Sequence, residues 1–261
     1  MKNIVLAGFH AVGARLRMDP KSISAVYLDP ERRDKRMREM REKLIAAGVR
    51  VMTADNRRLD GMAPDVPHQG IVAMAEEKQA QRTSGKAARR ALSPEQRAAA
   101  NAALCARLWQ LDAVQNAQTI LLYAAFGGEA GLAGFAAEAA RRGKVLAYPV
   151  CGENCSLTAA VPGPDGWETG LYGIRTPVLE RSVLLEPEQL DLVLVPCTAF
   201  DADCFRVGMG KGYYDRYLPR CTKAAKIGIA LEVQRVAHAA VDEHDQRLDA
   251  FVTERGLYTW T

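Results

Sequence analysis

A glycine-rich segment in the last quarter of the chain, residues 206–215, contains the residue types that bind phosphate. Its glycines stand at alternate positions, so the backbone can approach a ligand closely and turn its N–H groups inward. Arg206 and Lys211 flank the glycines and could hold phosphate oxygens. Asp215 lies one turn further on and could bind a magnesium ion that bridges the phosphates. The three glycines are Gly208, Gly210 and Gly212.

The spacing of this segment leaves a second interpretation open. It matches neither the P-loop pattern nor the dinucleotide-binding pattern, so spacing alone has low specificity. An ordinary glycine turn, with its tyrosines in the core and Arg206 paired with Asp201 or Asp203 at the surface, explains the residues about equally well.

The composition excludes several classes of protein. The chain has 261 residues, of which 48% are hydrophobic and 25% charged, which is typical of a globular protein and not of a disordered one. No stretch approaches the roughly 20 consecutive apolar residues of a membrane helix, and the N-terminus does not resemble a secretory signal. We therefore expect a cytoplasmic protein without membrane contact. Its six cysteines are scattered, which favours reduced thiols over a zinc site.

The distribution of charge and apolar runs predicts two α/β domains, residues 1–77 and 78–261. Residues 78–90 carry five basic side chains and no acidic one, with few large apolar groups, which is typical of a domain boundary. The first half predicts strands and helices in alternation, with a long helix near 34–47 that ends at Gly48.

The second half predicts a larger three-layer α/β domain with a mainly parallel sheet. Ser93, Pro94 and Gln96 have the pattern of a capping box that starts a helix. Continuous apolar runs then alternate with helical patterns, as expected for strands covered on both faces. These runs are residues 119–123, 144–148, 191–196 and 225–230.

The run VPCTAFD at 195–201, followed by RVGMGKGYYDR at 206–216, resembles the signature of the 5-formyltetrahydrofolate cyclo-ligase family, also called methenyltetrahydrofolate synthetases. The resemblance extends over residues 78–261. It includes Tyr172-Gly173-Ile174 as a Gly-Ile turn and the tail around Gln234, 244–245 and 252–254.

This resemblance implies an ATP- and magnesium-dependent cyclisation of 5-formyltetrahydrofolate to 5,10-methenyltetrahydrofolate, which releases ADP and phosphate through a phosphorylated formyl intermediate. Positioning and charge neutralisation dominate such a phosphoryl transfer. The resemblance assigns Arg206 and Lys211 to the moving phosphoryl group and Asp215 to magnesium. Lys78 and Arg82 would hold the nucleotide together with the glycine loop and Tyr213.

The resemblance also implies folate contacts. Glu129 would hydrogen-bond the pterin, and Tyr214 and Trp167 would offer stacking faces. An exposed loop acid is the alternative for Glu129, and an aromatic that covers the core is the favoured alternative for Trp167. Two departures from the family pattern bear on the site: Cys204 stands where glycine is common, and Thr176 stands where an acid is common.

Residues 3–77 resemble the substrate-binding domain of SpoU-type RNA ribose 2'-O-methyltransferases, through 8–12, 33–36 and 67–73. This implies RNA binding, for which an ordinary charged helix face is the alternative. His10 and His68 could touch ligand, although loop packing is the commoner role. No stretch resembles the methyltransferase domain, so methyl transfer from S-adenosylmethionine is not expected. The implied phosphate contacts are Arg32, Arg33, Lys35, Arg36, Arg57 and Arg58.

Two other functions remain as alternatives. The chain could be an RNA-binding protein that carries an inactive cyclo-ligase-like domain. Residues 1–77 could also mediate self-association.

Overall fold

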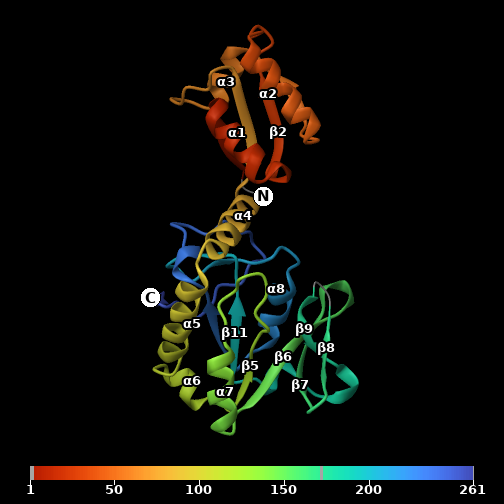
Figure 1. Cartoon of the computed structure of the whole chain (residues 1–261), viewed down its shortest axis with the longest axis vertical. Coiled ribbons are helices and arrows are strands. Elements are labelled where there is room, and N and C mark those ends of the chain that lie inside the picture. The colour runs from red at the N-terminus through yellow and green to blue at the C-terminus, as the bar shows by residue number, and fades with distance from the viewer. Residues whose placement is uncertain (1–2, 171–172, 261) are drawn as a thin grey trace. The chain divides into compact units, whose positions relative to one another are not determined.

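The computed structural model describes residues 3–170 and 173–260. The chain divides into two compact units, Met1–Thr83 and Ser84–Thr261 (Figure 1). Helix α4, Glu77–Arg90, runs through the point of division, so the basic stretch predicted as a domain boundary is helical. Among the described residues, no helix is both long and apolar enough to span a membrane.

The first unit contains a four-stranded sheet in the order β1-β4-β2-β3. Strands β2 and β3 are parallel, and β4 is antiparallel to both of its neighbours. The predicted long helix is confirmed: the Asp34 side chain accepts a hydrogen bond from the Met37 N–H at its start, and Gly48 follows its end at a φ of 71°. The elements are β1 Asn3–Ala7, α1 Gly8–Met18, β2 Ile23–Leu28, α2 Lys35–Ala46, β3 Val51–Thr53, α3 Asn56–Met62 and β4 Ile71–Glu76.

The second unit is built on an eight-stranded sheet in the order β10-β7-β6-β5-β11-β14-β15-β16. The predicted mainly parallel sheet is confirmed, since the five strands from β6 to β15 are mutually parallel. The antiparallel strands β7, β10 and β16 lie at the two edges. The strands of the sheet are β5 Thr119–Leu121, β6 Val145–Cys151, β7 Leu157–Pro162, β10 Ser182–Leu185, β11 Leu192–Pro196, β14 Ala225–Ile229, β15 Ala250–Val252 and β16 Leu257–Thr259.

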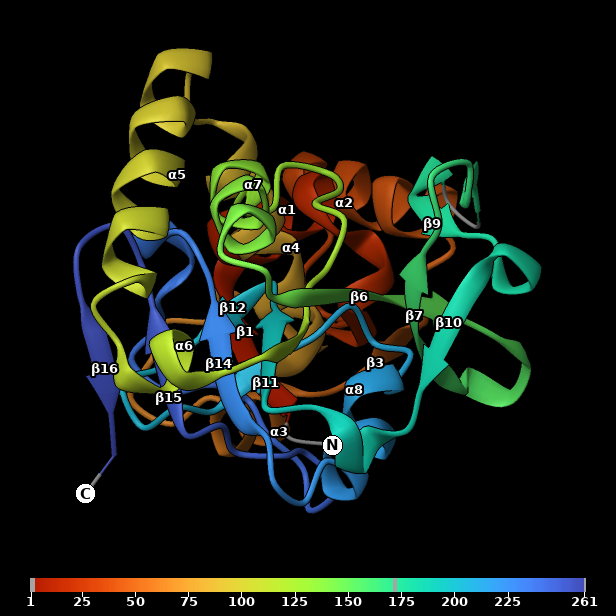
Figure 2. The same cartoon turned by 90° about the horizontal axis from the view of Figure 1, so that it is seen from below.

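The central strands are apolar throughout because both faces of the sheet are covered. Leu192 and Leu194 of β11 pack with α5 and α7 in one core cluster, whereas Val193 and Val195 point to the other face and pack with α8. Figure 2 shows these helices on opposite sides of the central strands. The helices are α5 Pro94–Leu108, α6 Asp112–Asn116, α7 Ala133–Arg141 and α8 Tyr213–Tyr217.

The capping box at the start of α5 is present as predicted. The Gln96 N–H donates to the Ser93 hydroxyl at 3.2 Å, and the Ser93 N–H donates to the Gln96 side chain at 2.9 Å. Two short hairpins complete the second unit and carry residues of the predicted site. They are β8 Trp167–Thr169 with β9 Arg175–Pro177, and β12 Ala199–Phe200 with β13 Arg206–Val207.

Candidate active site

The glycine-rich segment forms the connection from β13 to α8. Gly210 and Gly212 have φ angles of 97° and 71°, in the left-handed region that glycine adopts without strain. Lys211, between them, is exposed, so its ammonium group is accessible to a ligand. The predicted helix after the loop is only a five-residue turn of helix, with Gly212 at its N-cap.

Arg206 is nearly buried and faces Asp215 across this connection. Its Nη2 donates to Asp215 Oδ1 at 2.8 Å, and its Nη1 donates to the Gln246 carbonyl at 3.0 Å. The surface pairing of Arg206 with Asp201 or Asp203, the alternative considered from the sequence, is therefore not what the structure shows. Asp201 instead accepts hydrogen bonds from the N–H groups of Asp203 and Phe205 within its own turn.

Asp215, the predicted magnesium ligand, uses one oxygen within the protein. Oδ1 accepts from both Arg206 and the Gln246 N–H, and the side chain is 24% exposed. Within residues 3–170 and 173–260 there is no group of three or more His, Cys, Asp or Glu side chains able to enclose a metal. A single carboxylate still fits magnesium, which is commonly bound by one or two carboxylates together with substrate phosphates.

Glu129 lies in the turn after β5 and is not the exposed acid of the alternative interpretation. Its side chain is only 11% exposed, and Oε2 accepts a hydrogen bond from the Phe126 N–H at 3.0 Å. Burial raises the pKa of this carboxyl group, while the Phe126 N–H, Arg89 and Lys86 lower it. Oε1 lies 3.8 Å from Arg89 Nη1, too far for a hydrogen bond, so it keeps acceptor capacity for a ligand.

The structure brings Tyr214 close to Glu129. The Tyr214 hydroxyl is buried without a hydrogen-bond partner among the described residues. Burial raises the pKa of this hydroxyl, and the negative charge of Glu129 raises it further. A buried hydroxyl without a partner costs about 1–3 kcal/mol, so a ligand that hydrogen-bonds there gains affinity.

Trp167 begins strand β8 and packs between two side chains. Its ring lies edge-on to Tyr148 with centroids 4.8 Å apart, and the Arg175 guanidinium lies 4.3 Å from its centroid. These contacts agree with the packing role favoured from the sequence, and the half-buried ring leaves a stacking role as a prediction.

The two departures from the family pattern have local structural consequences. Cys204 is fully buried at a φ of 64°, a left-handed conformation that explains why glycine suits this position. The Thr176 hydroxyl donates to the Ile174 carbonyl at 3.0 Å inside the β8–β9 hairpin. Tyr172, in the predicted Gly-Ile turn, lies outside the described residues.

The predicted nucleotide contacts Lys78 and Arg82 are on the part of α4 that belongs to the first unit, whereas the glycine loop belongs to the second. Sequence reasoning missed Lys86, which repeats the same four-residue spacing with Arg90 further along α4. Lys86 is close enough to Glu129 to lower the pKa of its carboxyl group. The basic stretch contains two Lys–Arg pairs with i,i+4 spacing, Lys78 with Arg82 and Lys86 with Arg90. The spacing alone therefore does not show which pair belongs to the site.

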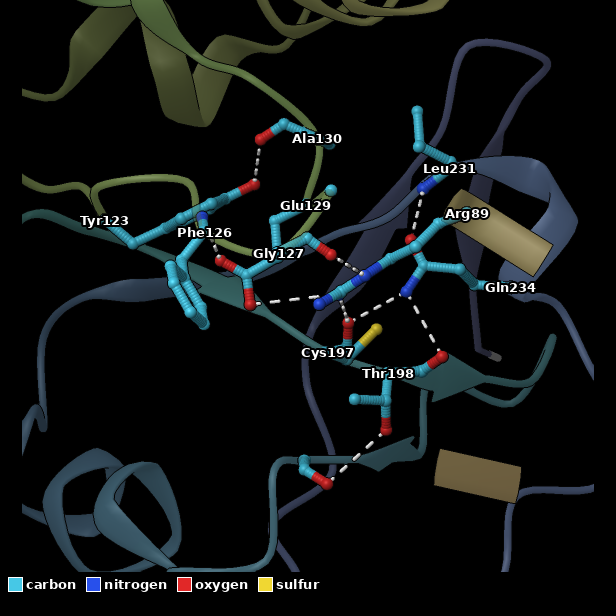
Figure 3. Close-up of polar contacts among 12 residues, drawn as sticks. Arg89, Tyr123, Phe126, Gly127, Glu129, Ala130, Cys197, Thr198, Leu231 and Gln234 are labelled. Atoms are coloured by element: carbon cyan, nitrogen blue, oxygen red, sulfur yellow. Dashed lines mark hydrogen bonds and ion pairs between the residues drawn. The ribbon is translucent and has the colours of Figure 1, made fainter. Parts of the chain in front are cut away.

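A second missed residue is Arg89, whose side chain is 1% exposed. It donates from Nε to the Gly127 carbonyl at 3.1 Å and from Nη1 to the Cys197 carbonyl at 3.3 Å (Figure 3). Gln234 donates to the same Cys197 carbonyl at 2.8 Å and to that of Thr198 at 3.2 Å. No periodicity in the sequence distinguishes the buried Arg89 from the four other basic residues of 78–90.

The implied RNA contacts of the first unit include three arginines that stack on aromatic rings. The guanidinium carbons of Arg32 and Arg36 lie 4.8 and 4.5 Å from the ring centroid of Phe9, and that of Arg58 lies 5.5 Å from the centroid of Tyr27. Arg33, Lys35 and Arg57 are exposed.

The two histidines of the first unit differ. His68 has a structural role, since its Nδ1 accepts from the Gly70 N–H at 3.0 Å and its Nε2 lies 3.0 Å from Asp60. His10 is exposed.

The fold and the site define the second unit as an α/β domain in which the buried carboxylate follows the carboxyl end of β5, and the glycine loop follows the β12–β13 hairpin that comes after β11. Such edges are where open α/β sheets bind ligands. Residues 74–254 match the sequence profile of the 5-formyltetrahydrofolate cyclo-ligase family, and residues 5–81 match that of RNA 2'-O ribose methyltransferase substrate binding. The chain belongs to the 5-formyltetrahydrofolate cyclo-ligase family, and the predicted resemblance is confirmed for both regions.

Individual relatives agree with this assignment. The 5-formyltetrahydrofolate cyclo-ligase of Escherichia coli is 30% identical over 178 residues, which cover 66% of this chain and 97% of the relative. The solved structure of Aquifex aeolicus 5,10-methenyltetrahydrofolate synthetase superposes with a TM-score of 0.63 at 30% identity, over 70% of this chain and 93% of that one. The Mycoplasma pneumoniae synthetase gives 0.58 at 26% identity, over 69% and 99%.

The first unit has separate relatives. The 23S rRNA (guanosine-2'-O-)-methyltransferase of Bordetella pertussis is 54% identical over 74 residues, which are 28% of this chain and 30% of the relative. That of Ralstonia nicotianae is 52% identical over 75 residues, 29% and 30% of the two chains. The chain thus spans about a third of the length of these methyltransferases.

Proposed function

We propose that the chain catalyses the ATP-dependent cyclisation of 5-formyltetrahydrofolate to 5,10-methenyltetrahydrofolate, and that residues 78–261 carry this activity. The observation that supports it most directly is that two buried polar groups stay open to a ligand: the Tyr214 hydroxyl directly after the glycine loop, and the Glu129 oxygen that its own turn does not use. A reduced pterin presents neighbouring N–H donors to a carboxylate and a flat face to an aromatic ring. These groups match what the two side chains offer.

The reaction balances without a covalent protein intermediate. The formyl oxygen attacks the γ-phosphorus of ATP and ADP leaves. N10 of the folate then attacks the activated carbon and loses its proton, and phosphate leaves with the former formyl oxygen and can take up that proton. In this proposal Lys211 and Arg206 neutralise charge on the transferring phosphoryl group, and the backbone from Gly208 to Gly212, with Tyr213, cradles the nucleotide.

Lys78 and Arg82 remain proposed nucleotide contacts, and the position of Lys86 makes it an additional candidate. Asp215 would hold the magnesium ion, which supplies charge neutralisation at the phosphates when bound.

The proposal is tested with the full chain by the absorbance rise of methenyltetrahydrofolate on addition of ATP and 5-formyltetrahydrofolate. Lys211→Ala should lower kcat/KM by about a hundredfold, a typical cost of losing one group that stabilises transition-state charge. Lys223→Ala removes the same charge from another exposed position and should leave kcat/KM unchanged. Absence of product with the unaltered chain, together with RNA binding, would favour the inactive cyclo-ligase-like alternative.

We also propose that residues 1–77 bind structured RNA, supported by the match to the substrate-binding profile and by the arginines on its surface. Binding should weaken steeply with salt, because phosphate contacts release counterions. Arg36→Ala should weaken binding to a ribosomal RNA fragment and reduce the salt slope by about one. Arg38→Ala, an exposed charge outside the proposed set, serves as control. Equal affinity for both variants and the unaltered chain, together with a dimeric mass by light scattering, would favour self-association.

A further inference from the structure

Arg89 is a buried cation beneath the turn that carries Glu129. Its guanidinium bonds to the carbonyls of Gly127 and Cys197 and lies 3.8 Å from the Glu129 carboxylate (Figure 3). Burial of a charge costs several kcal/mol unless partners compensate it. Accordingly, burial lowers the pKa of Arg89 while Glu129 raises it. Neutral hydrogen-bond donors would be enough to hold the two carbonyls. The positive charge of Arg89 therefore indicates an interaction with the Glu129 carboxylate.

The same turn is held from a second side by Arg97. Its Nη1 donates to the Gly128 carbonyl at 2.8 Å, and its Nη2 donates to the Arg89 carbonyl at 2.6 Å. Side chains of α4 and α5 therefore both hold the turn in place. Oε2 of Glu129 closes the turn by accepting a hydrogen bond from the Phe126 N–H. These bonds leave Glu129 with one defined orientation, in which Oε1 is the oxygen not used by the turn.

The charge of Glu129 depends on few neighbours. Arg89 and Lys86 face it from α4, Tyr123 from the end of β5, Tyr214 from α8, and Cys197 from the end of β11. Burial raises the pKa of both tyrosines, and it raises that of Cys197 to about 12, so these three groups are neutral near pH 7. The Phe126 N–H and the two cations of α4 oppose the effect of burial on the carboxylate, and Arg89 and Lys86 are the charged groups among them.

We propose that Arg89 is a positioning residue that fixes the Glu129 side chain and keeps it ionised to accept hydrogen bonds from the substrate. The substrate named in this inference rests on the proposed function. The effect of Arg89 on Glu129 does not depend on that function. The carboxylate must be charged to accept from pterin N–H donors. Loss of the cation would raise the pKa of Glu129 and leave a protonated acid that accepts poorly.

The test compares Arg89→Met with Arg89→Lys in steady-state cyclisation across pH. The KM for 5-formyltetrahydrofolate should rise as pH falls through the pKa of Glu129, and in Arg89→Met this rise should begin at higher pH. Each unit by which that pKa passes the assay pH lowers the carboxylate fraction about tenfold, so KM should increase by about that factor. The KM for ATP should not change. Arg89→Lys keeps a charge and should retain the original pH profile in part.

Gln234→Leu is the matched control, because Gln234 supports the same Cys197 carbonyl without facing Glu129. It should lower the unfolding temperature without shifting the pH profile. A double-mutant cycle with Glu129→Gln adds a second criterion: if Arg89 acts through Glu129, Arg89→Met should cause little further rise in KM once Glu129 is Gln. Additive effects with an unshifted pH profile would overturn the proposal and leave Arg89 as a scaffold residue.

A direct titration of Glu129 by carboxyl-carbon NMR separates this inference from the proposed function. The Glu129 signal, assigned by its loss in Glu129→Gln, should titrate at higher pH in Arg89→Met than in the unaltered chain. That result without any cyclisation would reject the proposed function and support the role of Arg89. An unchanged titration would reject that role even in an active enzyme. If Arg89→Met does not fold, the same titration in Arg89→Lys decides, with an identical pKa and unchanged KM counting against the proposal.

Discussion

A close contact between two backbone segments of the second unit predicts the effect of adding a single methyl group. Gly85 of α4 packs directly on the Thr198 carbonyl. A Cβ at Gly85 would lie 2.8 Å from the Thr198 carbonyl carbon and would overlap the oxygen. Non-bonded carbon atoms normally lie about 3.5–4.0 Å apart, so Gly85→Ala requires a backbone shift of about 1 Å.

The cost of that shift follows from what the neighbouring backbone holds. Overpacking of this kind costs about 1–3 kcal/mol. Displacing residues 197–198 would also weaken the bonds from Gln234 and Arg89, at about 1–3 kcal/mol in total. About 1 kcal/mol of this cost is offset, because alanine stabilises a helix relative to glycine. The net destabilisation is about 1–5 kcal/mol, which lowers the unfolding temperature of this unit by roughly 2–20 °C.

Differential scanning calorimetry of the full chain measures this directly, with the first unit's transition as an internal reference. Gly134→Ala is the matched control, since Gly134 lies in helix α7 and a Cβ there meets nothing within 4 Å. It should stabilise the second unit by about 0.5–1 kcal/mol. If Gly85→Ala proves as stable as Gly134→Ala, the reasoning that α4 is fixed by this contact is wrong.

Two further predictions concern the site. Asp215→Asn should raise the magnesium concentration needed for half-maximal activity by about tenfold or more, because an amide oxygen carries no charge for the cation; an unchanged requirement in a magnesium titration would show that Asp215 only pairs with Arg206. In thiol labelling of the native chain at pH 8, exposed Cys151 should react, whereas Cys197 should not. Burial raises the pKa of Cys197 to about 12, so its thiolate fraction is on the order of 10⁻⁴ there and grows only as pH rises. Rapid labelling of Cys197 without unfolding would contradict this.

Local signals predicted those elements whose residues interact within a few positions. The capping box at Ser93 and the helix cap at Asp34 depend on residues three positions apart, and both are present. Uninterrupted apolar runs predicted the parallel strands. A strand that is buried on both faces has apolar residues at every position and not only at alternate ones. The antiparallel edge strands were less predictable, because their short and partly exposed sequences carry a weaker pattern.

The site could be predicted only where its residues are contiguous. The glycine loop and Tyr214 lie together in one segment, so their types and spacing are visible in the sequence. Arg89 is buried only because the carbonyls of Gly127 and Cys197, distant in sequence, converge on it. The pairing of Arg206 with Asp215 likewise depends on how the β12–β13 hairpin turns back onto α8. These are tertiary contacts, which periodicity does not encode.

The hydrogen bonds of the second unit support the proposal that these groups form a binding site and not simply a polar core. Buried polar groups normally find partners, and Arg89, Arg206 and Gln234 all do. Glu129 Oε1 and the Tyr214 hydroxyl instead retain capacity inside a rigidly held framework. The buried Arg107 Nε and the Tyr217 hydroxyl also have no hydrogen-bond partner among the described residues, so the Tyr214 hydroxyl is distinguished by its place directly after the glycine loop. A carboxylate oxygen and a hydroxyl held open in a rigid framework favour ligand binding, because little further ordering is needed when a ligand binds.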